Sequence, residues 1–333
     1  MIMNKKTYIA LFLVIVLLLS CVSPVLADAA QEEQYPILSE LNPYVVKADV
    51  KSYLSDLGME GYIKLVDAVL ARETKVKLSN DFDTNLHSFG ALQGNPFCFF
   101  VEKLTFTDKN TAVKLTYKFT GAEQKAMYDF IVGEYLSILN EIIKSDMNEL
   151  DKALAVYHYF ATRIEYDYDW LDEFRATEDR FLYPDIAIYQ ALASNRGVCH
   201  SYTYLCEFAY QQIGIECLRF TGVLADDEDE GHMWLVVRID GQYYHCDPTW
   251  DRQGDQVGLR YFGMTDAERR ESGIVNFDLS YDATYGDVVC DSTIFSDFRT
   301  VQDFHFTDEP HKIYVDMGWM TGEYDTAEMK IVE

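Results

Sequence analysis

The chain has 333 residues, 49% of them hydrophobic, and a formal net charge of −27. This length and composition suffice to bury a core in one large domain or two smaller ones, and they exclude a disordered chain. The negative charge argues against nucleic acids and anionic membranes as partners. The same charge suits a soluble protein, and among partners or substrates it favours basic ones.

The first 27 residues have the pattern of a secretory signal peptide. Lys5 and Lys6 precede an apolar run from Tyr8 to Leu19, and Val25-Leu26-Ala27 offers the −3 and −1 positions of a cleavage site. The sequence therefore predicts a secreted or cell-envelope protein that begins, after cleavage, at residue 28.

A lipid anchor is an alternative to free release. Leu18-Leu19-Ser20-Cys21 resembles a lipoprotein cleavage motif, with Cys21 as the residue that would carry the lipid. No later stretch is apolar over enough residues to predict a membrane span.

Six cysteines follow the signal peptide. They lie at positions 98, 199, 206, 217, 246 and 290. This set is too sparse for a disulfide-dependent scaffold, although a bridge between Cys217 and Cys246 is one alternative. No Cys/His cluster has zinc-ligand spacing, so we expect no metal and no cofactor. The acidic run 226–230 offers oxygen ligands for Ca²⁺, but a solvated loop explains it equally well.

Residues 28–145 read as an N-terminal α/β region. Apolar residues recur at helical spacing from Gly58 to about Thr74. Residues 96–119 alternate as a β-hairpin with its turn at Asp108-Lys109-Asn110. A long amphipathic helix covers about Ala122 to Lys144.

Residues 146–255 read as the central core, and 256–333 as a C-terminal extension. A second long helix starts near Asp146, which with Glu149 resembles a capping box. Residues 165–188, rich in acids and tyrosines, predict a surface loop. The extension contains short strands and turns, with a helix at Asp266–Glu271.

Cys199 has the setting of a reactive thiol. Gly197 permits a close approach of the backbone, and a helical pattern begins next to Cys199 and ends before Gly214, which suits a helix C-terminus. Unpaired N–H groups and the helix dipole at a first turn favour a thiolate, which is the nucleophilic form. A buried, inert cysteine is the alternative.

His232 and Asp247 lie on two predicted strands joined by a tight turn. Asp240-Gly241 is a strong two-residue hairpin signal, which pairs Ile239 with Gln242. In that register His232 and Asp247 share a face as diagonal neighbours, with Cβ atoms about 7 Å apart or less. The carboxylate then reaches the imidazole, as the orienting acid of a triad does. A structural histidine and a turn-forming aspartate are the alternatives.

Further residues complete a recurring pattern around these three. They are Tyr189-x-Ala191-Leu192, Gly197-Val198-Cys199, Gly222, His232-x-Trp234 and Gly241-x-Tyr243-Tyr244-x-x-Asp247-Pro248-Thr249-Trp250-Asp251. Over roughly residues 150–255 this pattern resembles the transglutaminase-like superfamily, in its bacterial secreted branch. The resemblance implies an α+β fold with a papain-like core, in which a helix bearing the cysteine packs on an antiparallel sheet bearing the histidine and aspartate. Ser201 departs from the pattern, because the family often has glycine there.

The resemblance implies amide chemistry by a Cys199–His232–Asp247 triad and a thioacyl-enzyme. Gln190 and Tyr189 are candidate side-chain donors to the oxyanion beside the Cys199 N–H. Trp234 and Trp250 are candidate walls of the cleft, although packing explains each of them as well.

Three functions remain open on this basis. The leading one is a cysteine peptidase-like hydrolase of a protein or peptide. The second is transglutaminase-type acyl transfer to an amine, and the third is an inactive exported binding or adhesion module.

Overall fold

The computed structural model describes residues 37–45, 56–93, 95–177, 187–227, 230–279 and 288–332. The predicted signal peptide and Cys21 lie outside these ranges, as do two residues of the acidic run 226–230. Within the described ranges, no helix combines the length and the apolar character that crossing a membrane requires.

The N-terminal region is a small antiparallel sheet with two helices. Its elements are α3 (Asp56–Leu70), β1 (Lys75–Lys77), α4 (Phe82–Gln93), β2 (Val101–Thr107) and β3 (Ala112–Tyr117), with 3-10 turns at Cys98–Phe100 and Asp108–Asn110. The strand order is β1-β3-β2. The predicted hairpin is confirmed, and all three residues of its turn have positive φ.

Helix α4 has no counterpart in the sequence prediction. Its buried residues include Asn85 and Ser88, and Asn85 donates from Nδ2 to the carbonyls of Ser79 and Asn110 at 2.9 and 2.7 Å. A helix whose buried face is partly polar lacks the apolar stripe by which a helix is recognised in a sequence.

Five further helices precede the central sheet in the chain. They are α5 (Gly121–Ile142), α6 (Glu149–Arg163), α7 (Tyr168–Thr177), α8 (Ala187–Ser194) and α9 (Cys199–Gln212). The predicted capping box of α6 is wrong: Asn148 and Asp151 form it, not Asp146 and Glu149. The Asn148 side chain accepts from the Asp151 N–H at 2.8 Å, and the Asp151 carboxylate accepts from the Asn148 N–H at 3.1 Å.

The predicted loop over 165–188 is also wrong in its first half. Strand β4 (Glu165–Tyr166) pairs in parallel with β5 (Arg196–Gly197), and α7 follows. Within α7, Trp170 stacks on Phe174 at 5.2 Å between ring centroids. The acidic residues of this stretch are the reason why the sequence predicted a loop instead of a helix. Residues 178–186 lie outside the described ranges.

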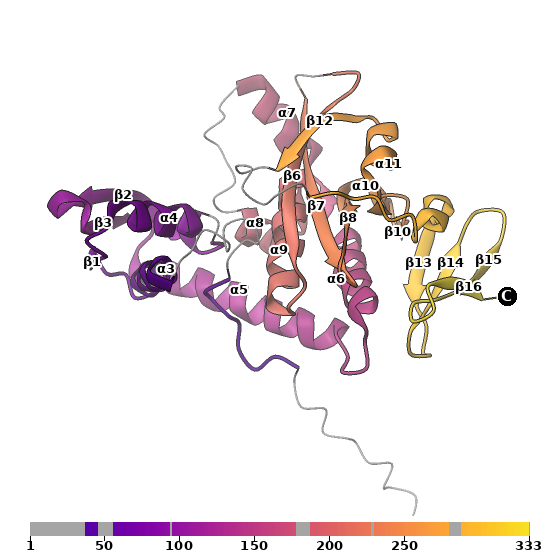
Figure 1. The fold of residues 1–333 in the computed structure, drawn as a ribbon, viewed down its shortest axis with the longest axis horizontal. Coiled ribbons are helices and arrows are strands. Elements are labelled where there is room, and N and C mark those ends of the chain that lie inside the picture. The colour runs from indigo at the N-terminus through magenta and orange to yellow at the C-terminus, as the bar shows by residue number, and fades with distance from the viewer. Residues whose placement is uncertain are drawn as a thin grey trace, which may run out of the picture. The chain divides into compact units, whose positions relative to one another are not determined.

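A five-stranded antiparallel sheet carries the centre of the molecule. Its order is β11 (Phe262–Met264), β8 (Gln242–Cys246), β7 (Gly231–Ile239), β6 (Cys217–Leu224) and β12 (Ile274–Leu279). Helix α9 packs on β6 and β7, and α6 packs on α9 (Figure 1). The predicted α+β arrangement, with the cysteine helix on an antiparallel sheet, is confirmed.

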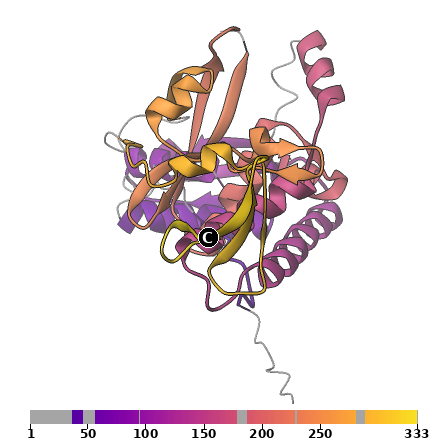
Figure 2. The ribbon, with the colours of Figure 1, turned by 90° about the vertical axis from the view of Figure 1, so that its right-hand side faces the viewer.

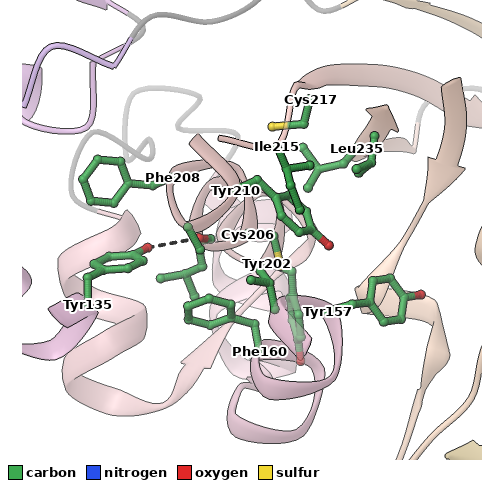
Figure 3. Packing of buried hydrophobic residues seen from close by; sticks show 14 of the residues in the cluster. Tyr135, Tyr157, Phe160, Tyr202, Cys206, Phe208, Tyr210, Ile215, Cys217 and Leu235 are labelled. Carbon is green, nitrogen blue, oxygen red and sulfur yellow. Dashed lines mark hydrogen bonds between the residues drawn. The ribbon is translucent and has the colours of Figure 1, made fainter. Parts of the chain in front are cut away.

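Tyrosines make up much of the core around α9 (Figure 3). Three of them donate to carbonyls of neighbouring helices or helix ends: Tyr135 to Leu205 at 3.1 Å, Tyr210 to Ala153 at 2.9 Å, and Tyr202 to Ile164. A buried hydroxyl must find an acceptor, so each bond fixes the place of α9 as well as filling space.

The chain after β8 contributes to the central sheet and to a separate one. Short elements come first: α10 (Pro248–Asp251), β9 (Arg252–Gln253), β10 (Gln256–Val257) and α11 (Asp266–Glu271), the last as predicted. After the 3-10 turn Ser296–Thr300, a four-stranded antiparallel sheet is formed by β13 (Asp303–Phe306), β14 (Lys312–Asp316), β15 (Thr321–Asp325) and β16 (Lys330–Val332). This sheet, coloured yellow, faces the viewer in Figure 2. The boundary between core and extension at residue 255 stays a prediction. Strands β11 and β12 lie after it in the chain and belong to the central sheet.

The cysteines of the described chain are free thiols. Cys206, Cys217, Cys246 and Cys290 are buried, whereas Cys98 and Cys199 are partly exposed. The alternative of a bridge between Cys217 and Cys246 is therefore wrong. They lie on β6 and β8, which β7 separates.

Candidate active site

Cys199 is the first residue of α9, as predicted. Val198 precedes it as the N-cap residue in an extended conformation. Gly197 is needed for the close approach of the chain, because a Cβ there would lie 2.4 Å from the Cβ of Ser201. Backbone N–H groups at the start of a helix and the helix dipole favour negative charge, so the thiol lies where a helix stabilises a thiolate.

The hairpin β7–β8 has the predicted register. Ile239 pairs with Gln242 and Leu235 with Cys246, around a turn in which Asp240 and Gly241 both have positive φ. Asp247 follows β8 and caps α10, with its Oδ1 accepting from the Thr249 N–H at 3.1 Å.

His232 and Asp247 meet as the register requires. Nε2 of His232 lies 2.6 Å from Oδ2 of Asp247. Cys199 is among the groups that interact with the imidazole and raise its pKa, and Nδ1 is the ring nitrogen that Asp247 leaves for this interaction. The histidine is 7% exposed and the aspartate 0%. In space, the imidazole of His232 thus lies between the Cys199 thiol and the Asp247 carboxylate.

The positive charge of His232 and the negative charge of Asp247 stabilise each other. Burial lowers the pKa of His232, but the charge and hydrogen bond of Asp247, together with Cys199, outweigh it and raise the pKa to about 9. Burial raises the pKa of Asp247, but the charges of His232 and Arg269 outweigh it, so the net direction is downward. The imidazolium and the carboxylate are therefore both favoured near neutral pH.

Arg269 is a neighbour that the sequence analysis missed. Its Nη2 lies 2.9 Å from Oδ2 of Asp247, and both side chains are completely buried. It comes from α11, where the sequence DAERRE reads as an ordinary solvated helix. A pattern search has no means of finding a residue whose role depends on a tertiary contact.

The two predicted cleft tryptophans have different places. Trp250 stacks on the ring of His232, at 4.7 Å between centroids and 19° between planes, and is half-buried. Trp234 is completely buried and donates from Nε1 to Nδ1 of His245 at 2.9 Å. Trp234 therefore packs behind the imidazole, and its prediction as a wall of an open cleft is wrong.

The predicted oxyanion donors have no described contact with Cys199. Tyr189 packs against Phe130 of α5, with ring centroids 5.5 Å apart, and Gln190 is exposed on α8. This placement fits a packing role for Tyr189. His200, which follows Cys199, is buried against Trp170, and burial lowers its pKa to about 4.

Tyr166 is brought close to the start of α9 by strand pairing. It lies opposite Gly197 in the β4–β5 pair. Burial raises its pKa, and the charge of Cys199 is the next cause. A tyrosine held protonated beside the thiol is a hydrogen-bond donor.

An open hollow of about 420 Å³ adjoins these residues. Its lining joins β4, α7, the residue before β7 and the segment from α10 onward: Tyr166, Tyr168, Leu171, Arg175, Glu230, Thr249, Trp250, Arg252 and Gly254. Two of the lining residues connect the hollow to the neighbourhood of Cys199 and His232: Tyr166 pairs with Gly197, and Trp250 stacks on His232.

A second group of polar side chains lies behind Trp234. His245, Asp266 and Cys290 place their polar side-chain atoms within 4.8 Å of one another. The indole N–H can only donate, so Nδ1 of His245 is unprotonated and Nε2 carries the proton that it gives to Asp266 at 2.8 Å. This arrangement fits a hydrogen-bonded chain, because a metal would need the lone pair of Nε2.

Comparison with known proteins agrees with the fold and the motif. The family model of the transglutaminase-like superfamily matches residues 137–248, a range that contains Cys199, His232 and Asp247. Over this segment, about a third of the chain, the protein is similar to the transglutaminase-like superfamily.

Two solved structures are similar in part. The crystal structure of a TGase matches at 15% identity and a TM-score of 0.31, over 56% of this chain and 47% of that one. A candidate cysteine protease from Cytophaga hutchinsonii matches at 13% identity and a TM-score of 0.27, over 45% of this chain and 62% of that one. The chain thus spans about half of the first and less than two thirds of the second. A search of curated proteins found no match.

Proposed function

We propose that this protein is a cysteine-dependent amide hydrolase acting on proteins or peptides. The observation that carries the proposal is the placement of His232 between the Asp247 carboxylate and the Cys199 thiol at the start of α9. The transglutaminase-like core supports cysteine-protease-like or acyl-transfer chemistry.

The first half of the reaction is acylation. The thiolate of Cys199 attacks the carbonyl carbon of an amide, and the oxygen becomes an oxyanion. The imidazolium of His232 then gives its proton to the leaving nitrogen as the C–N bond breaks. An amine departs, and the acyl group stays on sulfur as a thioester.

The second half is transfer to water. Neutral His232 takes a proton from a water molecule, whose oxygen attacks the thioester. The C–S bond breaks, a carboxylic acid leaves, and the thiolate–imidazolium pair is restored. An amine that replaces water would give transamidation by the same steps.

Two groups would stabilise the oxyanion. The backbone N–H of Cys199 is one, at the positive end of α9. For the other, we propose the hydroxyl of Tyr166 in place of Tyr189 and Gln190, because Tyr166 adjoins Gly197 and lines the hollow.

Product analysis tests this function. The chain from residue 28 is incubated with a peptide library from a bacterial proteome, with and without monodansylcadaverine, beside a Cys199→Ala variant. We expect cleaved or deamidated peptides from the wild type only. Dansyl-labelled peptides would instead assign acyl transfer, and no Cys199-dependent product of either kind would favour the inactive binding module.

Export is a separate proposal, based on residues 1–27. Expression of the full gene product in a bacterial host with a secretion pathway would yield a protein beginning at residue 28, or at a lipidated Cys21. Mass spectrometry of the isolated protein decides between them, and an intact residue 1 on all of the protein would contradict export.

A further inference from the structure

We propose that Arg269 is a positioning residue of the catalytic group: its guanidinium fixes the Asp247 carboxylate against His232 and balances its charge throughout the reaction. This inference rests on the proposed function. Arg269 lies on α11, outside the family-matched residues 137–248.

The carboxylate of Asp247 is held at both oxygens. Oδ2 contacts Nε2 of His232 at 2.6 Å and Nη2 of Arg269 at 2.9 Å, while Oδ1 accepts from the Thr249 N–H at 3.1 Å. Three donors from β7, α11 and α10 therefore define one orientation. With Nε2 tied to Oδ2, Nδ1 is directed to Cys199.

The guanidinium lies between two indoles. Its Cζ is 4.3 Å from the ring centroid of Trp234 and 4.5 Å from that of Trp250. Nε and Nη1 are buried and have no hydrogen-bond partner in the described part of the chain. Arg269 thus commits one hydrogen bond to Asp247 and rests otherwise on aromatic faces, which attract a cation.

The charge of Arg269 matters most when His232 is neutral. While His232 is an imidazolium, Asp247 has a cationic partner there. Once the proton has passed to the leaving amine, Asp247 would be a buried, unpaired anion without Arg269, and such a group binds a proton instead. A permanently charged guanidinium prevents this.

The same charge limits how tightly His232 holds its proton. A cation close to the imidazolium repels it, so Arg269 opposes the effect of Asp247 and keeps His232 able to act as an acid. The other titratable groups close by are Tyr157, Tyr261 and Asp251. Burial raises the pKa of Tyr157, which therefore stays protonated, and Asp251 is present in every variant considered.

The free-energy cost of burying the Arg269 guanidinium indicates a role beyond packing. Replacing a buried ion pair by apolar residues is often neutral or stabilising, so stability alone gives little reason for a buried arginine with two unpaired nitrogens. Its contacts instead converge on the residues of the proposed triad.

The test compares Arg269→Gln with Arg269→Lys. Glutamine can still donate to Oδ2 and lie between the indoles without charge, whereas lysine keeps the charge. Arg270→Gln is the matched control, since Arg270 is exposed on the same helix and contacts Phe277. Histidine titrations are followed by ¹⁵N NMR in a Cys199→Ser background, beside thermal unfolding.

We expect the titration of His232 to rise by about one pH unit or more in Arg269→Gln, since a repelling cation is lost. It should stay close to that of the parent in Arg269→Lys and Arg270→Gln. In the Cys199-containing proteins, Arg269→Gln should lower the hydrolysis rate at saturation at least tenfold, and Arg269→Lys should restore part of it.

Two outcomes would overturn the inference. One is a folded Arg269→Gln protein with an unchanged His232 titration. The other is a downward shift toward an ordinary histidine, which would show that Arg269 only keeps water out. Because the titration needs no substrate, it decides the role of Arg269 even if the proposed hydrolysis is not observed.

Discussion

At His232, the surroundings of one side chain account for the chemistry we propose. Asp247 holds Nε2, Cys199 interacts with the ring, and the indole of Trp250 covers a face at 4.7 Å. Burial alone would favour the neutral ring, so the raised pKa depends on these partners. A histidine held in this way keeps its proton at pH 7 and can deliver it to a leaving amine.

Tyr166 is the residue whose removal best tests the oxyanion assignment. Tyr166→Phe should lower kcat about 10²-fold with little change in KM, because the lost hydrogen bond forms fully only in the transition state. Tyr189→Phe is the matched control and should retain the parent kcat, since Tyr189 packs on Phe130. The reverse ranking in steady-state hydrolysis would return the donor role to Tyr189.

At the level of elements, the site depends on where α9 begins and how β7 meets β8. The sequence predicted both, because Gly214 and the helical period delimit α9 and Asp240-Gly241 specifies the turn. The amino-acid pattern alone was therefore enough to bring Cys199, His232 and Asp247 together. Their catalytic roles stay a prediction that only experiment can test.

The features that the sequence did not predict have separate physical causes. The acidic residues of α7 favoured a loop, and none of its residues whose burial is described is fully buried. Helix α4 buries polar residues, and the contact of Arg269 with Asp247 joins segments 22 residues apart, so neither leaves a periodic apolar signal in the sequence. The same holds for Tyr166, which a parallel strand pair brings to Gly197.

The start of α9 can be tested by a pair of substitutions. A Cβ at residue 197 would lie 2.4 Å from the Cβ of Ser201, so Gly197→Ala should displace the helix start and destabilise the fold by about 1–3 kcal/mol. Adding Ser201→Gly removes the obstructing atoms and should recover part of this loss, less about 1 kcal/mol for glycine in a helix. Denaturant unfolding measures both, and a double variant no better than Gly197→Ala would refute the steric account.

Across the whole molecule, the segment after the family-matched core is part of the same structure. Strands β11 and β12 flank the central sheet, and α11 supplies Arg269. Asp251 links these parts, since its Oδ2 accepts from the Tyr157 hydroxyl of α6 and from the Tyr261 N–H at 2.9 Å.

Asp251 should make stability depend on pH. Burial raises the pKa of Asp251 to about 7, against 3.8 for the unperturbed group. Between these values the folded state binds more protons than the unfolded state, so the contribution of Asp251 to stability falls as pH rises from 3.8 to about 7 and is constant above. Asp251→Asn cannot titrate and should lose this decline.

Urea unfolding at a series of pH values compares the two proteins. The stability of Asp251→Asn relative to the wild type should increase from pH 4 to pH 7. A relative stability that is constant, or that decreases over this range, would mean that Asp251 is ionised in the fold.

The most direct test of the proposed triad is the pH dependence of Cys199 alkylation by iodoacetamide, with the labelled peptide identified by mass spectrometry. In the wild type we expect fast labelling that persists well below pH 7, and a second change near pH 9, where His232 loses its proton. In His232→Ala, labelling should rise in a single step near an ordinary thiol pKa of about 8.5. An ordinary profile in both proteins would contradict the thiolate–imidazolium pair and with it the account of this protein as a cysteine-dependent enzyme.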